Sequence, residues 1–277
     1  EGGRKKPSGF VLDFVGIFDK LEKALAFDSS DVTEVVKDIK VLKERFVELM
    51  KTAKIDYLKV IKGKKSDKAV ESVLEYFKDE DERQDFYKFF NELSDIYEIL
   101  SPDAFLRLYI DDFDTLARMY KILKEAFEPG IMIDREFTRK TAALVREHTY
   151  SGEIKSSLDI YEINEKTLKK LEESNSSDTE KVFNLLRSIG LTIQKTRESS
   201  PYLVSIGEKA ELISLIYKQR QKDTEETLEE LRNLVKEINE AREDQKKRNM
   251  NADVFSVYWL LKQESFSEAE EKANSMK

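Results

Sequence analysis

The residues of this chain that could do chemistry are few, and their spacing matches no common catalytic or metal-binding pattern. The single histidine, His148, follows Glu147 near the end of a predicted amphipathic helix. A Ser-His-Asp arrangement would have to use this histidine, and a di-iron helical bundle needs Glu-x-x-His on two helices. One histidine cannot supply two motifs, and position 145 is valine rather than glutamate. We therefore interpret His148 as a structural or capping residue.

Other signatures of catalysis are missing from the sequence. The chain has no cysteine, so disulfides, thiolate nucleophiles and cysteine-based metal sites are ruled out. It has neither of the common glycine-rich phosphate loops, G-x-x-x-x-G-K-[ST] and G-x-G-x-x-G, and it lacks the G-x-S-x-G nucleophile elbow. We expect no enzymatic activity from this chain and no cofactor in it.

Acidic clusters at 79–82 and 111–114 could in principle bind a cation. Adjacent carboxylates on a helix or turn point in different directions, however. The first cluster also lies in the opening turn of a predicted helix, where the helix dipole favours negative charge. We interpret both clusters as solvated faces. The 16 phenylalanines and 11 tyrosines share helix stripes with leucine and isoleucine, which favours core packing over stacking on nucleic-acid bases.

The composition predicts a helical protein with a substantial core. The 277 residues include 40% hydrophobic and 38% charged residues but only 9 glycines and 4 prolines, which favours long helices. No run of about 18 apolar residues is present, so we expect no membrane span. The net charge of −8 disfavours nucleic-acid binding as the main role, unless basic residues gather on one face.

Hydrophobic periodicity places the elements that must carry any site. Apolar residues recur at three- and four-residue steps, which predicts an irregular all-α bundle of about ten helices. The predicted helical segments are 31–61, a helix from 67, 86–100, 102–128, 134–149, 164–173, 178–199, 201–248, 253–263 and a helix from 267. Residues 151–164 are predicted to be a loop or a short extended piece.

Several helix ends carry capping signals. Ser101 before Pro102 predicts an N-cap with proline at the first helical position. Ser177 with Glu180 predicts a capping box, in which each side chain bonds the backbone of the other residue. Ser267 with Glu270 predicts a further cap. In the segment after Pro201, the residues expected to pack first are Leu212, Ile213, Leu215, Ile216 and Tyr217.

One element does not fit an all-α bundle. Residues 10–15 are apolar and rich in aromatic and β-branched side chains, which predicts a strand that ends at Gly16. The rest of the sequence offers no second strand of comparable strength. A strand needs a partner, because its backbone N–H and C=O groups must be satisfied. The sequence pattern alone therefore leaves the partner of this predicted strand unidentified.

The opening stretch VLDFVGIFDKLEKALAFD (residues 11–28) closely resembles the segment that follows the helicase core in restriction (R) subunits of type I restriction–modification enzymes. In that family a motor domain ends with a strand, a glycine and a helix that reads much like LEKALAFD. More diffuse similarity follows in FTRKTAALVREHT, YEINEKTL, EAREDQ and DVFSVYWLL, at residues 137–149, 161–168, 240–245 and 253–261.

The resemblance implies an organisation of the chain. Residues 1–16 would be the residual tail of a RecA-like motor domain, and the predicted strand would be an edge of that domain's sheet. Residues 17–277 would form the C-terminal helical domain, with a possible sub-division near 130–177.

The resemblance also implies a role. The family's parent subunit is an ATP-dependent type I site-specific deoxyribonuclease that uses ATP and Mg, but none of its catalytic motifs matches a position here. The implied role is therefore non-catalytic assembly in the cytoplasm of a bacterium or archaeon. The domain would dock the R subunit onto the modification (M) and specificity (S) subunits and would brace its own motor domains.

Two groups of residues are candidates for contacts. The apolar cluster Phe255, Tyr258 and Trp259 either docks a partner or packs into the domain's own core. The second group is a cluster of four lysines, Lys62, Lys64, Lys65 and Lys68. These lysines could contact the backbone of DNA leaving the motor, with weak and salt-dependent affinity. An unrelated free-standing helical enzyme or scaffold is the third hypothesis.

Overall fold

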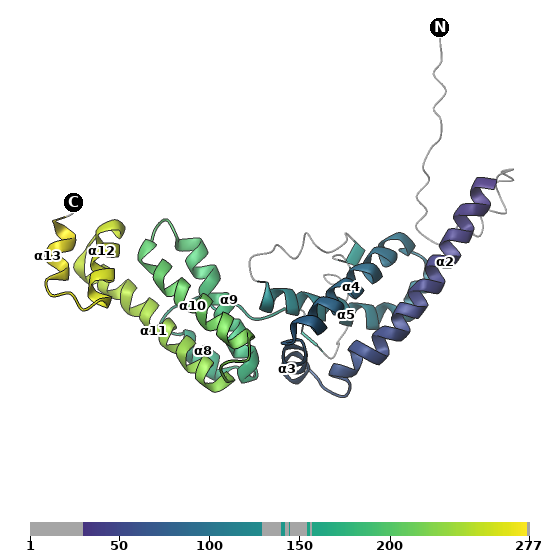
Figure 1. Cartoon of the computed structure of the whole chain (residues 1–277), viewed down its shortest axis with the longest axis horizontal. Coiled ribbons are helices and arrows are strands. Elements are labelled where there is room, and N and C mark those ends of the chain that lie inside the picture. Colours follow the sequence, from purple (N-terminus) through teal and green to yellow (C-terminus); the bar gives the residue numbers. More distant parts are fainter. Residues whose placement is uncertain (1–29, 129–139, 142–143, 145–153, 156, 276–277) are drawn as a thin grey trace, which may run out of the picture. The chain divides into compact units, whose positions relative to one another are not determined.

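The computed structural model describes residues 30–128, 140–141, 144, 154–155 and 157–275 (Figure 1). Within these residues the chain forms ten α-helices and contains no strand, which confirms the predicted all-α class. The predicted strand at 10–15 and His148 lie outside the described residues. So does most of the predicted 134–149 helix, of which Lys140, Thr141 and Leu144 are described and are helical.

Most helices follow the predicted segments, but the segment predicted at 201–248 is two helices, Val204–Lys218 and Thr224–Arg248, with a break at 219–223. The α-helix predicted from 102 begins only at Ile110. Some α-helices are preceded or followed by short turns of other helix types. The 3-10 turns are Leu58–Ile61, Ala104–Tyr109 and Pro201–Leu203, and a π-helical turn is formed by Ala53–Tyr57. The α-helices are α2 Ser30–Thr52, α3 Asp67–Tyr76, α4 Glu80–Leu100, α5 Ile110–Phe127, α8 Thr167–Glu173, α9 Asp178–Thr196, α10 Val204–Lys218, α11 Thr224–Arg248, α12 Ala252–Gln263 and α13 Ala269–Asn274.

The chain divides into two compact units that interleave along the sequence. The first unit takes Glu1–Lys59, Phe86–Ala117 and Asp134–Ser151. The second takes the remaining segments, which are Val60–Asp85, Arg118–Ile133 and Gly152–Lys277. Helices α4 and α5 therefore contribute residues to both units. The boundary expected at residues 16 and 17 lies outside the described residues.

The first unit has an aromatic core centred on Phe113 of α5. Tyr97 of α4 stacks on Phe113 with ring centroids 4.1 Å apart, and Phe90 stacks at 5.8 Å. Phe46 of α2 lies 6.4 Å from the same ring. Such offset and edge contacts stabilise a core beyond the area that they bury. The predicted α4 stripe is buried as expected, at Phe86, Phe89, Phe90, Leu93, Ile96, Tyr97 and Leu100.

The predicted cap at Ser101 is wrong. The turn that leads into α5 is instead capped by Asp103, whose carboxylate accepts a 2.8 Å hydrogen bond from the Phe105 N–H. Asp103 also pairs with Lys43 of α2 at 2.5 Å. Partial burial opposes ionisation of Asp103, but these two partners outweigh it and hold its pKa below the ordinary value. The carboxylate thus caps one helix and anchors another.

The second unit is built on α9, α10 and α11, which pack against one another, with α3 on α9 and α8 on α11. Helices α9 and α10 approach closely at Gly207, where an added Cβ would lie 2.9 Å from Ile193 Cδ1. The core-facing side chains of α9 and α11 are Val182, Phe183, Leu185, Ile189, Leu228, Leu231, Leu234, Val235 and Ile238.

The prediction for α10 is wrong in part. Tyr217 is buried as expected, but Leu212 is 58% exposed and Leu215 is 53% exposed. The helix packs instead through Ile206 and Ala210. Apolar residues cover more than one side of α10, so their periodicity does not specify which of them are buried.

The C-terminal helices are joined by two asparagines. Asn249 ends α11 in the left-handed conformation, with φ 51°, and the Asn251 side chain accepts from the Val254 N–H at 2.9 Å to cap α12. The predicted Ser267 cap is wrong, because α13 follows Glu268 and has no side-chain cap. Glu270, its expected partner, forms an ion pair with Arg248 instead.

An extended segment threads through the second unit, as predicted for the loop after residue 151. Ile154, Leu158 and Ile163 are buried along it. Because this segment has no helix of its own, its backbone groups are satisfied by side chains. Glu125 of α5 accepts a hydrogen bond from the Leu158 N–H at 2.8 Å, and Arg187 donates to the Leu158 carbonyl. The side-chain oxygens of Asn184 and Ser188 accept from the N–H groups of Asp159 and Tyr161, respectively.

Only one of the two hydrogen bonds of the predicted capping box at Ser177 forms. The Ser177 hydroxyl accepts from the Glu180 N–H at 3.2 Å, as predicted. The Glu180 side chain does not reach back to Ser177; its fully buried carboxylate accepts from Lys155 Nζ at 2.8 Å. Lys155 also pairs with Asp67 at the start of α3, at 2.5 Å. One ammonium group therefore joins α3, α9 and the extended segment.

The pKa values of Lys155 and Glu180 are set by two opposing effects, burial and ion pairing. Burial disfavours the charged form of Lys155, but its hydrogen bonds with Asp67 and Glu180 outweigh that effect and raise its pKa. Burial raises the pKa of Glu180, against the opposing effect of Lys155. Lys155 consequently remains protonated and supplies the positive charge that two carboxylates need.

Replacing this ammonium group tests its structural role. The Lys155→Met variant leaves a buried carboxylate without its partner, and we expect a loss of about 3 kcal/mol in the free energy of unfolding. Urea unfolding measures the loss. The matched control is Lys169→Met, which removes an exposed pair with Glu173 on α8 and should change stability by less than about 1 kcal/mol. Equal effects of the two variants would contradict the assigned role.

Candidate functional site

The three aromatic residues predicted as docking anchors lie in the core of the second unit. Phe255 is fully buried, and Tyr258 and Trp259 are 4% and 5% exposed. Phe255 contacts Tyr202 edge-on, with ring centroids 4.8 Å apart, and stacks on Trp259 at 5.8 Å. Of the two alternatives that the sequence left open, the structure shows the core position. These side chains offer no exposed surface to a partner.

A polar bracket around Asp244 holds this aromatic cluster against α11. The carboxylate accepts from Lys262 Nζ at 2.8 Å and from the Tyr258 hydroxyl at 3.1 Å, and it pairs with Arg248 at 2.8 Å. Burial opposes ionisation of Asp244, but these partners outweigh it and lower its pKa. Sequence reasoning missed the bracket, although Asp244 and Arg248 have the i,i+4 spacing of a helical ion pair.

The four candidate DNA-contact lysines are exposed and lie close together in the chain. Three of them, Lys62, Lys64 and Lys65, belong to the turn after Ile61, where Gly63 adopts a φ of 73°. Lys68 is in the first turns of α3. Lys64 Nζ donates to the Val60 carbonyl at 3.1 Å. In the part of the chain that the structure describes, no carboxylate lies within ion-pair distance of any of these lysines.

The exposed apolar surface lies on α10 rather than on α12. Leu212 and Leu215 are three residues apart, so they share one face of the helix. Ile213 and Ile216 beside them are partly exposed. The sequence signal for this surface is that the apolar residues of α10 cover more than one side of the helix, which leaves some of them uncovered once one side is packed.

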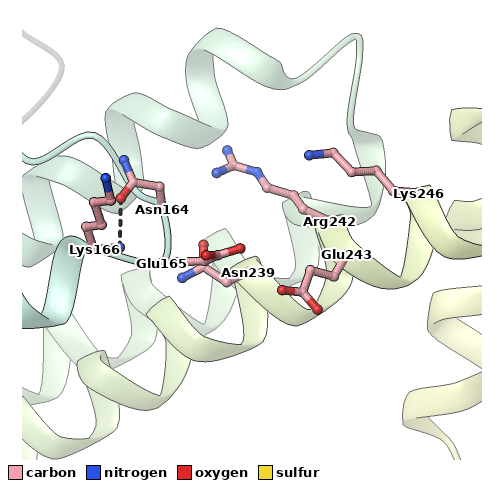
Figure 2. A pocket seen from close by; sticks show the side chains of 7 residues that line it. All are labelled: Asn164, Glu165, Lys166, Asn239, Arg242, Glu243 and Lys246. Carbon is pink, nitrogen blue, oxygen red and sulfur yellow. Dashed lines mark hydrogen bonds between the residues drawn. The ribbon is translucent and has the colours of Figure 1, made fainter.

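A polar cleft of about 340 Å³ lies between the turn that precedes α8 and the C-terminal half of α11 (Figure 2). No sequence motif pointed to it, because its residues come from two segments about 75 positions apart in the chain. The residues that line it are Asn164, Glu165, Lys166, Asn239, Arg242, Glu243 and Lys246.

An aromatic and cationic cluster joins the ends of α5, α9 and α10. Phe183 lies between Phe127 and Tyr217, with ring centroids 5.0 and 5.7 Å away. Lys218 Nζ donates to the Phe127 carbonyl at 3.1 Å. Burial and the nearby Arg83 guanidinium lower the pKa of Lys218 to about 8. This lysine satisfies a carbonyl at the C-terminal end of α5.

Comparison of the chain with protein-family models, with curated proteins and with solved structures found no match. Among the described residues, no helix has the length and apolar character needed to cross a membrane. The same residues contain no group of three or more histidine, cysteine or acidic side chains arranged to hold a metal ion.

The core position of Phe255 makes a direct prediction. The Phe255→Ala variant should lose about 3–5 kcal/mol in the free energy of unfolding, because a fully buried ring leaves a cavity. Leu260 is the matched control on the same helix, since it is 52% exposed. Leu260→Ala should cost less than about 1 kcal/mol. Chemical denaturation of both variants checks the difference, and a stable Phe255→Ala protein would contradict the core assignment.

Proposed function

We propose that this chain is a helical assembly domain of the R subunit of a type I restriction–modification enzyme. It docks the ATP-dependent translocase and nuclease subunit onto the complex of M and S subunits, in the cytoplasm of a bacterium or archaeon. The support for the family is the resemblance of residues 11–28, which also assigns residues 1–16 to the preceding motor domain. The activity that uses ATP and Mg belongs to the parent subunit in this proposal.

The observation that carries the docking role is the exposed leucine pair on α10. Leu212 and Leu215 each leave more than half of their side chain uncovered, and a partner helix or groove is the ordinary way to cover such a face. Burying the remaining apolar surface of each leucine contributes about 1 kcal/mol. Glu208 and Glu211 flank the pair, which favours a partner surface with a basic rim.

The charged clusters of the second unit support a scaffold rather than a catalyst. Asp244 is held by Arg248 and Lys262, and Lys155 is held by Asp67 and Glu180. Charges that pair among themselves in this way fix helices against each other. A catalytic acid or base instead needs a geometry that reaches a substrate.

A second candidate function is a DNA-guiding element, and the exposed lysine turn at 62–68 favours it. Its four ammonium groups face solvent, so they are available to phosphate oxygens. The net charge of −8 restricts such binding to this local surface.

A mixing experiment tests the docking role. The chain is titrated into the cognate complex of M and S subunits in a calorimeter, without DNA, at low and moderate salt. We expect saturable binding that persists at moderate salt, because the contact on α10 is apolar. The Leu212→Glu, Leu215→Glu double variant should bind at least about tenfold more weakly, which corresponds to about 1.4 kcal/mol.

The matched control is Ile160→Glu, because Ile160 is 53% exposed in the same unit but lies on the extended segment. It should bind as the parent chain does. Unchanged binding by the double variant would remove α10 from the interface. Salt-sensitive binding to duplex DNA, without binding to the protein complex, would favour the DNA-guiding role, and replacing the four lysines by glutamine should then abolish it.

A further inference from the structure

The polar cleft beside α11 has uncompensated positive charge. It is lined by three cationic side chains, Lys166, Arg242 and Lys246, and by two carboxylates. None of these cations has a carboxylate within ion-pair distance among the described residues. One of the carboxylates, Glu243, is already paired with Lys247 at 3.1 Å, and Lys247 does not line the cleft. The cleft therefore presents an excess of positive charge to a ligand.

The two cations on α11 are arranged to act together. Arg242 and Lys246 are four residues apart, so they lie on the same face of the helix. Figure 2 shows both side chains extending from α11 to the same side of the helix. An NH group of Arg242 donates to the Ile163 carbonyl at 2.5 Å, which fixes the guanidinium plane. A guanidinium has five N–H donors, so others remain to bind an anion.

The opposite wall of the cleft supplies a donor of fixed orientation. The Asn164 side-chain oxygen accepts from the Lys166 backbone N–H at 2.9 Å, as the dashed line in Figure 2 shows. This bond orients the amide, so its NH₂ group is the end left for a ligand. Lys166 adds an ammonium group on the same turn. Donors therefore line both sides of the cleft, which suits an oxygen-rich anion.

The remaining lining residues can accept hydrogen bonds from hydroxyl groups. Glu165 and the Asn239 amide lie near each other below the cationic side chains in Figure 2. A carboxylate and an amide oxygen are the usual partners of sugar hydroxyls, and arginine is the usual partner of a phosphate. The volume of about 340 Å³ is at the small end of the range for ligand pockets, which limits the ligand to a small molecule.

We propose that this cleft binds a sugar phosphate, with its phosphate group on Arg242 and Lys246 and its hydroxyls on Glu165 and Asn239. The inference is independent of the docking role, because it rests on different residues. Free sugar phosphates and the ribose-phosphate part of a nucleotide share this chemistry. Binding of ribose 5-phosphate and of adenosine monophosphate distinguishes the two sources, since no aromatic or aliphatic residue is among those that line the cleft and could stack on a base.

Calorimetry or NMR titration with ribose 5-phosphate tests the proposal on the full chain. We expect saturable binding in the micromolar to millimolar range, with adenosine monophosphate no tighter and ribose without phosphate at least about tenfold weaker. Lys246→Gln should weaken binding about tenfold. Its side chain makes no hydrogen bond or ion pair with the described residues, so this variant should fold normally, as circular dichroism will check.

The matched control is Lys236→Gln, which changes the net charge equally but acts on an exposed lysine of α11 that does not line the cleft and pairs with none of its residues. It should leave the affinity within about twofold of the parent value. No saturable binding at millimolar ribose 5-phosphate would overturn the proposal, as would equal losses in the two variants, which indicate diffuse attraction. Glu165→Gln should weaken the binding of ribose 5-phosphate without weakening the binding of inorganic phosphate. An equal effect on both ligands, or no effect on either, would overturn the proposed contact between Glu165 and a sugar hydroxyl.

Discussion

The second unit depends on satisfying the backbone of one buried segment that is not a helix. Residues 157–163 run between helices with Leu158 and Ile163 buried and Ile160 exposed, so the backbone groups beside the buried side chains need partners within the protein. Buried polar side chains on α5 and α9 meet this requirement, among them Glu125 and Asn184. Burial raises the pKa of Glu125, against the opposing effect of the Leu158 N–H and Arg187. These polar residues are buried because the segment needs them.

The same segment links the other features of the unit. Lys155 at its beginning joins the starts of α3 and α9 through Asp67 and Glu180. Ile163 at its end offers the carbonyl that orients Arg242 on α11. The polar cleft therefore exists where the extended segment turns into α8. Part of this cleft in a helical unit is thus formed by the segment that is not a helix.

Sequence reasoning predicted the helices well and their exposed faces poorly. Helix ends with local signals were placed correctly, as at Gly63 and Ser177, because the cap and the glycine act within a few residues. The cap at Ser101 was wrong because Asp103, two residues later, is a better acceptor that Lys43 also holds. On α10 the apolar residues cover more than one side, so tertiary packing decides that Leu212 and Leu215 face outward.

The candidate surfaces were harder to predict, because they depend on contacts between distant segments. Trp259 and its neighbours are the most apolar run near the C-terminus, which suggests a docking anchor, yet an aromatic cluster of this size is equally suited to a core. The role of Glu180 in pairing with Lys155, 25 residues away, has no local signature. The cleft on α11 has none either, since its two walls are about 75 positions apart in the chain.

The central claim is that α10 is the face through which this helical domain binds the complex of M and S subunits. Hydrogen–deuterium exchange of the chain, alone and in that complex, tests it most directly. The account predicts that exchange slows in Val204–Lys218 on binding, while α4 in the first unit keeps its rates. Slower exchange confined to the lysine turn at 62–68, or unchanged exchange in α10 within a stable complex, would contradict it.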